Sequence, residues 1–205
     1  MLTNLFLASS SQTRQLLLRE AGFSFEILRN TCTPEPFDSK ISLKQNAQAT
    51  ATCKAKTVEL PYKTPMVAKT IFVITADTLI ADIKGEILQK PHDLENAKQQ
   101  LTKLAAGSCS IGTSCVIQKY TWTIQKGWIL KKTKEIYSKS TAKFYVTKES
   151  FDEYFQKLPI ALYVCGAGVI EGFGSQFLKN FKGSYSGALG LPLFEVKETL
   201  KKLGH

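Results

Sequence analysis

The chain has 205 residues, 43% of them hydrophobic, which is enough for a single domain with a buried core. Its 27 lysines and arginines outnumber 17 aspartates and glutamates, and the formal net charge of +10 favours anionic partners. Because the lysines are scattered rather than clustered, a basic solvated surface is the simpler reading, and a nucleic-acid-binding module is a remote alternative.

Other features of the composition exclude whole classes of protein. No stretch reads as a transmembrane span or a secretion signal, which predicts a cytoplasmic protein without a membrane partner. The five cysteines are an odd number with no Cys-x-x-Cys spacing, which favours reduced thiols over disulfides or a zinc knuckle. Of the two histidines one is the last residue, so a histidine-based triad or metal site would depend on His92 alone. Carboxylates, basic residues and a hard cation are the remaining agents of catalysis.

A run of serines separates the first predicted strand from the first predicted helix. Residues 2–8 are mostly apolar, and residues 10–21 fit a helix that one of the serines at 9–11 can cap. The free N–H groups of a helix N-terminus favour anions, and Arg14 adds a planar set of donors suited to phosphate. The alternative is an ordinary N-cap with a solvated arginine.

Apolar periodicity and the positions of glycine and proline predict the remaining elements. They are, in chain order, a strand over 23–28, a loop over 29–40, a helix over 41–60, a strand over 67–75, a hairpin over 79–88 that turns at Lys84–Gly85, a helix capped by Asp93 that runs to Ala105, three strand-like runs between Ser110 and Val146, a short helix over 148–157, a strand over 162–170, a short helix over 172–181 and a last helix over 192–203. This alternation predicts an α/β fold. No repeat or linker divides the chain, so we expect one domain over residues 1–205.

A carboxylate directly after the strand 67–75 is a candidate for chemistry. Asp77 and Thr78 follow the apolar run 71–74, and the carboxyl ends of strands line the ligand crevice of open α/β sheets. A carboxylate there can hold a divalent cation and orient a water, although an Asx-turn that closes the strand is an equal alternative. Lys54 and Lys90, each taken alone, read as surface lysines.

Five segments of the chain occur in an order shared with a known family. They are Leu7–Ala8–Ser9–x–Ser11–x–x–Arg14, Lys54–Ala55, Ala76–Asp77–Thr78, Gly85–x–Ile87–Leu88–x–Lys90–Pro91, and Gly183–Ser184–Tyr185 followed by Gly190–Leu191–Pro192. In these segments the chain resembles the Maf (septum formation inhibitor) family of nucleoside triphosphate pyrophosphatases. The resemblance covers nearly the whole length, and the order and spacing together make it specific.

The resemblance implies a fold similar to the inosine triphosphate pyrophosphatases: a mixed twisted sheet with flanking helices, and two lobes around a nucleotide cleft. It implies cleavage of a nucleoside triphosphate with a modified or pyrimidine base, such as 7-methyl-GTP, dTTP or UTP, to the monophosphate and pyrophosphate. A divalent cation, Mg²⁺ or Mn²⁺, is implied as cofactor, and a homodimer would be unsurprising. By position, the resemblance makes Asp77 the proton acceptor and, with Glu35, a metal ligand, and it places Ser9, Ser11, Arg14, Lys54, Thr78, Lys90 and Glu171 in contact with the substrate.

The chain departs from the family pattern at several of its polar positions. Gln12–Thr13–Arg14 replaces the usual Pro–Arg–Arg and lacks one arginine, and a family lysine aligns with Val164. A family Asp–Glu pair aligns with Thr33–Pro34, where Glu35 could replace the glutamate only if the loop shifts. Glu171 replaces a glutamine linked to base selection, and its carboxylate would accept hydrogen bonds from ring N–H or amino groups, which favours guanine-like bases over thymine. The departures leave open a second hypothesis, a nucleotide-binding regulatory protein with weak or absent catalysis.

Overall fold

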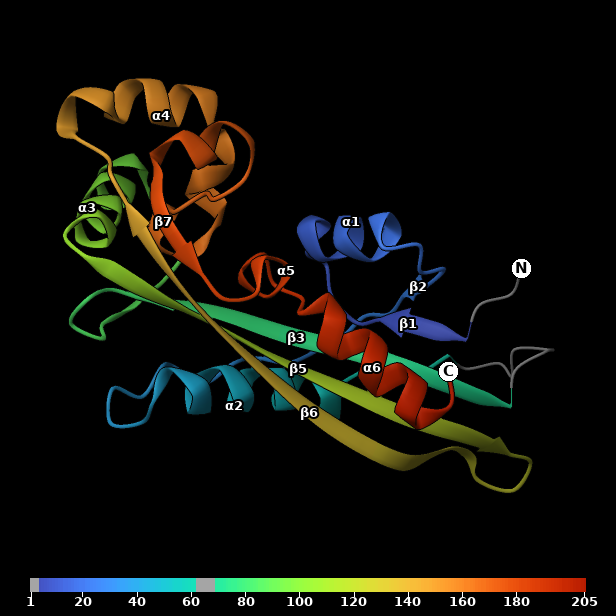
Figure 1. Ribbon diagram of the computed structural model, residues 1–205. Coiled ribbons are helices and arrows are strands. Elements are labelled where there is room, and N and C mark those ends of the chain that lie inside the picture. The colour runs from blue at the N-terminus through green and yellow to red at the C-terminus, as the bar shows by residue number, and fades with distance from the viewer. Residues whose placement is uncertain (1–3, 62–68) are drawn as a thin grey trace.

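Seven strands form one mixed, twisted sheet in the computed structural model, which describes residues 4–61 and 69–205 (Figure 1). They are β1 (Leu5–Leu7), β2 (Glu26–Ile27), β3 (Thr70–Ala81), β4 (Ile87–Leu88), β5 (Ser108–Thr123), β6 (Gly127–Phe144) and β7 (Leu178–Lys182). Their order is β2-β1-β3-β5-β6-β7, and β4 pairs with β3 outside that row. β1 is parallel to β2 and β3, whereas the other pairs are antiparallel.

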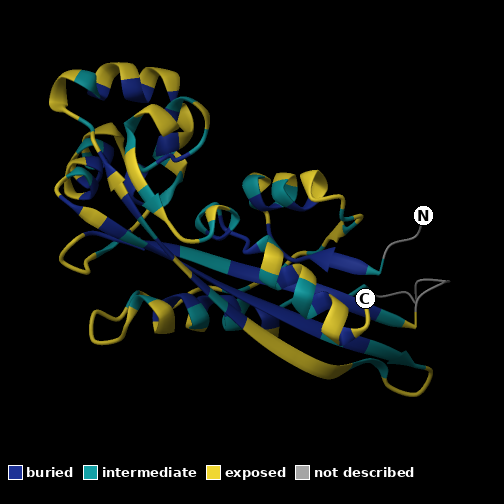
Figure 2. Cartoon of the chain, in the orientation of Figure 1, coloured by how far each residue is buried: buried dark blue, intermediate teal, exposed yellow. Residues whose placement is uncertain are grey.

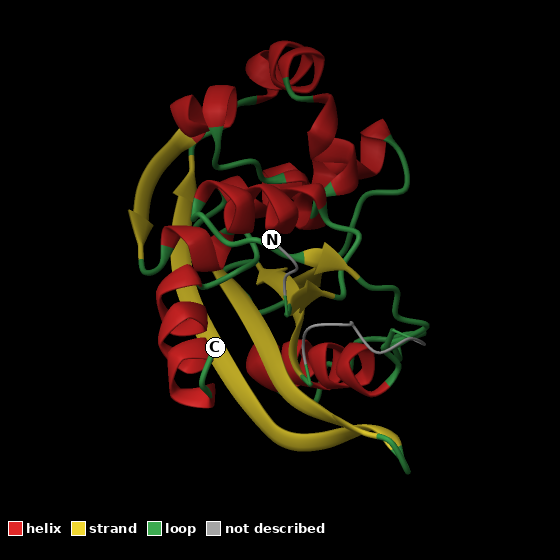
Figure 3. Ribbon diagram, turned by 90° about the vertical axis from the view of Figure 1, so that its right-hand side faces the viewer, coloured by secondary structure: helices red, strands yellow, loops and turns green. Residues whose placement is uncertain are grey.

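Helices cover both faces of the sheet and gather at one end of it (Figures 1 and 3). They are α1 (Gln12–Glu20), α2 (Leu43–Lys56), α3 (Leu94–Ala105), α4 (Phe151–Lys157), α5 (Tyr185–Ala188) and α6 (Leu193–Leu203), with 3-10 turns η1 (Lys148–Ser150), η2 (Pro159–Tyr163), η3 (Cys165–Ala167) and η4 (Gly172–Phe177). α1 and α6 lie on one face and α2 on the other, while α3 and α4 pack together with η2 and η3 at the end (Figure 1). None of the described helices is both long and apolar enough to cross a membrane.

Helix α1 packs its apolar side onto the central strands. Ser11 caps the helix, and its Oγ accepts a hydrogen bond from the backbone N–H of Arg14 at 3.4 Å. Leu18 lies fully buried in the main core, which also holds Phe72 of β3 and Leu200 of α6. The central strands are accordingly buried along most of their length (Figure 2). α1 is therefore packed against the sheet through Leu18, and its N-terminus follows the end of β1.

Helix α2 approaches the opposite face closely because its inner residues are small. Ser42 and Gln45 form a capping box at its start, and Ala51 and Ala55 are buried against Val116 of β5. The hydroxyl of Thr75 on β3 donates to the carbonyl oxygen of Ala51 at 3.1 Å. Because α2 lies so close to the sheet, the side chain of Lys54 on this helix reaches β3.

The α/β class, the mixed sheet with flanking helices and several predicted elements are confirmed. The helix at 10–21, the loop at 29–40, the hairpin at 79–88, the helix capped by Asp93 and the last helix occur where the sequence places them, within a few residues at their ends. Residues 2–3 and 67–68 of the predicted strands lie outside the described residues.

The boundaries of three sets of predicted elements are wrong. β3 does not end at Thr75 but continues to Ala81, because β5 pairs with it throughout and sets Ser114 opposite Asp77. The three runs between 110 and 146 are the two long strands β5 and β6. The end of the predicted helix at 172–181 belongs to β7 instead, which pairs with β6.

The apolar stretch 162–170 is a series of turns instead of the predicted strand. Gly166 and Ala167 adopt positive φ angles of 70° and 56°, which break an extended chain. The hydroxyl of Tyr154 on α4 donates to the carbonyl oxygen of Ala167 at 2.8 Å and accepts from the N–H of Val169 at 3.0 Å. A side chain thus satisfies the backbone groups that a neighbouring strand would otherwise have paired.

Leu18→Ala tests the packing of α1 against the sheet. We expect it to lower the free energy of unfolding by about 2–5 kcal/mol, because it leaves a cavity in the main core. Leu16→Ala on the same helix is the matched control, since Leu16 is 52% exposed and Leu18 is 0% exposed. Urea unfolding of both variants measures the difference, and equal losses would contradict the described packing.

Candidate active site

A cleft of about 1200 Å³ opens where β1 ends beside β3. β1 pairs with only three residues of β3, Phe72 to Ile74, and the chain then turns away into the serine run. On that side β3 next pairs with β4, at Ile80 and Ala81. The intervening residues of β3 therefore border an opening between the start of α1, helix α2 and the turns at 160–171.

The structure brings the predicted site residues together, with one exception. The residues that line the cleft include Ser9, Ser11, Arg14, Lys54, Asp77, Thr78, Lys90 and Glu171. Glu35 is exposed, and the cleft wall at that point is formed instead by its neighbours Pro34 and Phe37. Side chains that are up to 162 positions apart, from Ser9 to Glu171, thus share one surface.

Arg14 is buried at the base of the cleft and is held by three hydrogen bonds. Its Nε donates to the carbonyl oxygen of Gly190 at 2.8 Å, Nη1 to Ser9 Oγ at 3.2 Å and Nη2 to Thr78 Oγ1 at 3.0 Å. Burial lowers the pKa of Arg14 and the nearby Asp77 carboxylate opposes this, but an arginine stays charged in either case. A side chain at Gly190, whose φ is 115°, would be strained and would crowd Arg14 Nε.

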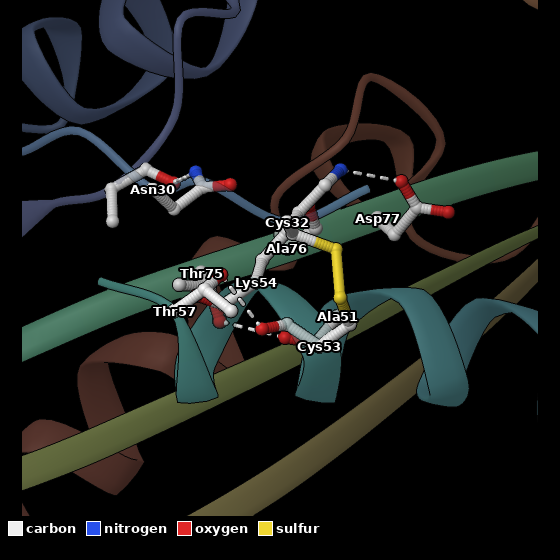
Figure 4. Close-up of a disulfide and its surroundings, with 10 residues drawn as sticks. Asn30, Cys32, Ala51, Cys53, Lys54, Thr57, Thr75, Ala76 and Asp77 are labelled. Atoms are coloured by element: carbon white, nitrogen blue, oxygen red, sulfur yellow. Dashed lines mark hydrogen bonds and ion pairs between the residues drawn. A yellow bond between two sulfur atoms is a disulfide. The ribbon is translucent and has the colours of Figure 1, made fainter. Parts of the chain in front are cut away.

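Lys54 and Asp77 form an ion pair at the edge of β3. Lys54 Nζ lies 2.7 Å from Asp77 Oδ1 and also donates to the carbonyl oxygen of Ala76 at 3.3 Å (Figure 4). The two side chains are 21% and 14% exposed, so the pair faces the cleft without being fully solvated. Burial lowers the pKa of Lys54; Asp77 opposes this shift, and the positive charges of Arg14 and Lys90 add to it.

The serine turn presents donors to the same space. Ser9 Oγ accepts hydrogen bonds from the N–H of Ser11 at 3.3 Å and from Arg14, so its own proton is available to a ligand. The N-terminus of α1 carries no acidic residue in its first turn, and its N–H groups and partial positive charge favour an anion. The cleft therefore gathers hydrogen-bond donors and positive charge on one surface.

The donor set suits a divalent cation only in company with an anionic ligand. Among the described residues no group of three or more histidine, cysteine, aspartate or glutamate side chains is placed to hold a metal ion. Asp77 is a carboxylate on the cleft wall, and Mg²⁺ in proteins commonly binds to one or two carboxylates together with substrate phosphates. Asp77 thus fits a cation that takes most of its ligands from phosphate oxygens and water.

A disulfide between Cys32 and Cys53 corrects the expectation that all thiols are reduced. The two Cα atoms are 5.7 Å apart, and the bond ties the loop at 29–40 to α2 beside Lys54 (Figure 4). The sequence does not predict this pairing, because the cysteines are 21 positions apart and meet only when the loop folds back over the helix. Of the described cysteines, Cys109, Cys115 and Cys165 are free.

Sequence reasoning also missed some residues of the cleft wall. Arg29, Asn30 and Cys165 line the cleft, and Asn30 Nδ2 donates to the carbonyl oxygen of Ala8 at 3.0 Å, which fixes the turn after β1. A single arginine after a short strand resembles any surface residue, so no local signal distinguishes Arg29. Asn30 acts through a backbone contact that only the parallel pairing of β1 and β2 creates.

The fold and the cleft define an α/β protein whose cleft gathers cations, hydroxyls and one lysine-paired carboxylate. A family model described as "Maf-like protein" matches residues 4–203, and the chain belongs to this Maf family. It is 31% identical to a dTTP/UTP pyrophosphatase of Caldicellulosiruptor saccharolyticus, over 97% of this chain and 94% of that protein. The dTTP/UTP pyrophosphatase of Escherichia coli K12 is 30% identical, over 97% and 92% of the two chains.

One solved structure, described as "The structure of the Staphylococcus aureus Ham1 protein", matches more distantly. It is 15% identical and covers 70% of this chain and 72% of that chain, with a TM-score of 0.32.

Lys54 gives the site a pH dependence. We expect the affinity for inorganic tripolyphosphate to fall at alkaline pH, with its midpoint below the ordinary lysine value of 10.5, because burial lowers the pKa of Lys54. Arginine stays protonated in this range, so Lys54→Arg should move the midpoint to higher pH. Titration calorimetry from neutral to alkaline pH measures both proteins, and identical midpoints would contradict the role of Lys54.

Unfolding does not account for that loss. The unfolded chain holds the Lys54 proton more tightly than the folded chain, so the contribution of this group to stability rises with pH across the interval between the two pKa values. Thermal melts at each pH provide the control.

Reduction tests the tether between the loop and α2. For a separation of 21 residues, loss of the disulfide should lower the free energy of unfolding by about 3 kcal/mol. Dithiothreitol should therefore destabilise the wild-type protein in urea and leave Cys53→Ser unchanged. If the reductant leaves the wild-type midpoint in place, the described bond contributes nothing to stability.

Proposed function

We propose that this chain hydrolyses a nucleoside triphosphate between the α and β phosphates, giving the monophosphate and pyrophosphate. The observation that carries the proposal is the convergence of Arg14, Lys54, Lys90 and the α1 N-terminus on the cleft that also contains Asp77. Two relatives of this chain that match it over nearly its full length are named dTTP/UTP pyrophosphatases, which supports the same reaction here.

The cations and hydroxyls bind the triphosphate. Arg14 has five N–H donors and spends three hydrogen bonds on the protein, so it keeps donors for phosphate oxygens. Lys90 adds an exposed positive charge, and the Ser9–Ser11 turn adds backbone and hydroxyl donors. Groups held in place before the reaction stabilise the charge that develops on the leaving pyrophosphate.

Asp77 activates the attacking water. Lys54 occupies Oδ1 of its carboxylate, which fixes the orientation of the side chain and leaves Oδ2 to accept a proton from water. A divalent cation bound with the triphosphate would neutralise phosphate charge, and Asp77 is the residue proposed to hold it. Glu35, as the loop stands here, does not reach the cleft.

The base is read at the end of the cleft that contains Glu171. Burial raises the pKa of Glu171, and the nearby Glu20 raises it further. A hydrogen-bond donor on a bound base would stabilise the charged carboxylate and oppose this shift. Uracil and thymine present one ring N–H, whereas guanine presents a ring N–H and an amino group. The names of the relatives favour dTTP and UTP, and Glu171 favours a 7-methyl-GTP-like base, so both classes belong in the substrate panel.

A second function, nucleotide binding without turnover, has its own supporting observation. Thr13 and Val164 line the cleft at positions where the family pattern has an arginine and a lysine. Loss of a single stabilising contact at a transition state costs roughly 3–4 kcal/mol in enzymes where this has been measured. Arg29 lines the same cleft and supplies a further cation.

Asp77→Asn separates the two functions. We expect wild-type protein to release pyrophosphate from one member of a panel of standard and modified nucleoside triphosphates with Mg²⁺ or Mn²⁺. Asp77→Asn should lower this turnover by roughly 10²–10⁴-fold, because the amide cannot accept the proton. It should leave the melting temperature nearly unchanged, since the amide oxygen can still accept from Lys54.

The matched control is Asp152→Asn on α4, whose side chain is 95% exposed and pairs with Lys98. Undiminished turnover in Asp77→Asn would remove Asp77 from the mechanism. If the folded wild-type protein is stabilised by a nucleotide and releases no pyrophosphate from any panel member, the silent binder is the correct reading.

A further inference from the structure

A buried threonine outside the cleft is linked to Arg14 by a chain of hydrogen bonds. Thr113 of β5 lies opposite Thr78 of β3, is 0% exposed, and is not among the residues that line the cleft. Its Oγ1 lies 2.9 Å from Thr78 Oγ1 and 2.6 Å from the carbonyl oxygen of Gly187 in α5. Thr78 Oγ1 in turn lies 3.0 Å from Arg14 Nη2.

The direction of every hydrogen bond in this chain follows from counting protons. The Gly187 carbonyl can only accept, so the single proton of the Thr113 hydroxyl points to it. Thr113 must then accept from Thr78, whose proton is thereby fixed. The Thr78 oxygen is left as an acceptor that faces the guanidinium of Arg14, which can only donate. Reversing the bonds would set the lone pairs of Thr113 Oγ1 against the Gly187 carbonyl oxygen at 2.6 Å, with no proton between them.

Both ends of this network are anchored on one segment. The Gly190 carbonyl accepts from Arg14 Nε directly, and the Gly187 carbonyl is reached through the two threonines. Gly187 can approach this closely because a Cβ atom at this position would lie 2.5 Å from Ser138 Oγ. The glycine-rich segment 183–192, which no step of the proposed reaction uses for chemistry, thus supports the guanidinium plane from two sides.

We propose that Thr113 is a positioning residue that acts through Thr78 to fix the guanidinium of Arg14 toward the phosphates. The inference rests on the proposed function for the role of Arg14, and it adds a residue that never touches substrate. A planar guanidinium binds phosphate oxygens well only when its plane is held, so a small rotation weakens two bonds at once. Without the Thr113 hydroxyl, the Thr78 proton competes for other acceptors and Arg14 Nη2 loses its fixed partner.

Thr113→Val and Thr113→Ser test this role, since valine has nearly the shape of threonine and serine keeps the hydroxyl. We expect Thr113→Val to lower kcat/KM for the preferred nucleotide by roughly tenfold, mainly through kcat, and Thr113→Ser to stay within about twofold. The Gly187 carbonyl keeps the N–H of Gly190 as a partner in the valine variant, so the α5 turn retains its own bond. If the valine variant does not fold, Thr113→Ala takes its place.

A double-mutant cycle distinguishes positioning from general structural damage. Lysine at position 14 has no Nη2, so Thr113→Val should cost less than about twofold in an Arg14→Lys background. An equal loss in both backgrounds, or no loss in the wild-type background, would overturn the proposal. The same four proteins are also melted with and without inorganic tripolyphosphate, which reports on phosphate binding without turnover.

The second readout separates this proposal from the proposed function. If the wild-type protein releases no pyrophosphate, the function fails while the tripolyphosphate shifts still show whether Thr113 acts through Arg14. A wild-type protein that tripolyphosphate does not stabilise would overturn the positioning role as well, because Arg14 would then bind no phosphate.

Discussion

The early end of β1 beside β3 is the constraint on which the rest of the site depends. A strand alternates its side chains between two faces, so Asp77 points to the α2 face and Thr78 to the α1 face. Inside an intact sheet these neighbours would be separated by the backbone layer. Where β1 stops, one edge of β3 is left without a neighbouring strand. Lys54 from the α2 face and Arg14 from the α1 face then reach the same cleft. A break in parallel pairing thus joins two faces of the sheet into one binding surface.

Positive charges that lie close together repel one another and destabilise the folded protein. The structure reduces this repulsion in a different way for each cation. Arg14 is buried and keeps its charge through three oxygen acceptors, which suits a group that does not deprotonate. Lys54 is partly exposed and paired with Asp77, although burial still lowers its pKa. Lys90 and Arg29 also line the cleft. A triphosphate would relieve the mutual repulsion of all four, so binding should be strongly electrostatic.

The sequence predicted those parts of the fold that depend on local chemistry. A cap from one of the serines at 9–11 and the Asp93 cap are each encoded by a few adjacent residues, and both occur, the first at Ser11. The length of β3 and the turns at 162–170 depend on contacts between different elements. β5 pairs with β3 and extends it, and the hydroxyl of Tyr154 on α4 takes the place of a strand partner for the turns. The family resemblance placed most site residues in one cleft, but it could not place Glu35 or reveal the disulfide, because both depend on the path of a loop.

The two cations that face Asp77 and Thr78 are each supported from outside the cleft, and the two supports differ in kind. Helix α2, which carries Lys54, is tied by the Cys32–Cys53 bond to the loop that forms one wall, so a covalent link sets its position. Arg14 is set by carbonyls at Gly187 and Gly190, more than 170 residues away along the chain, through hydrogen bonds alone. Reduction can release the first support, whereas the second persists as long as the core around β3 and β5 stays packed. The position of Lys54 therefore depends on the redox state of one bond, whereas that of Arg14 depends only on the packing of the core.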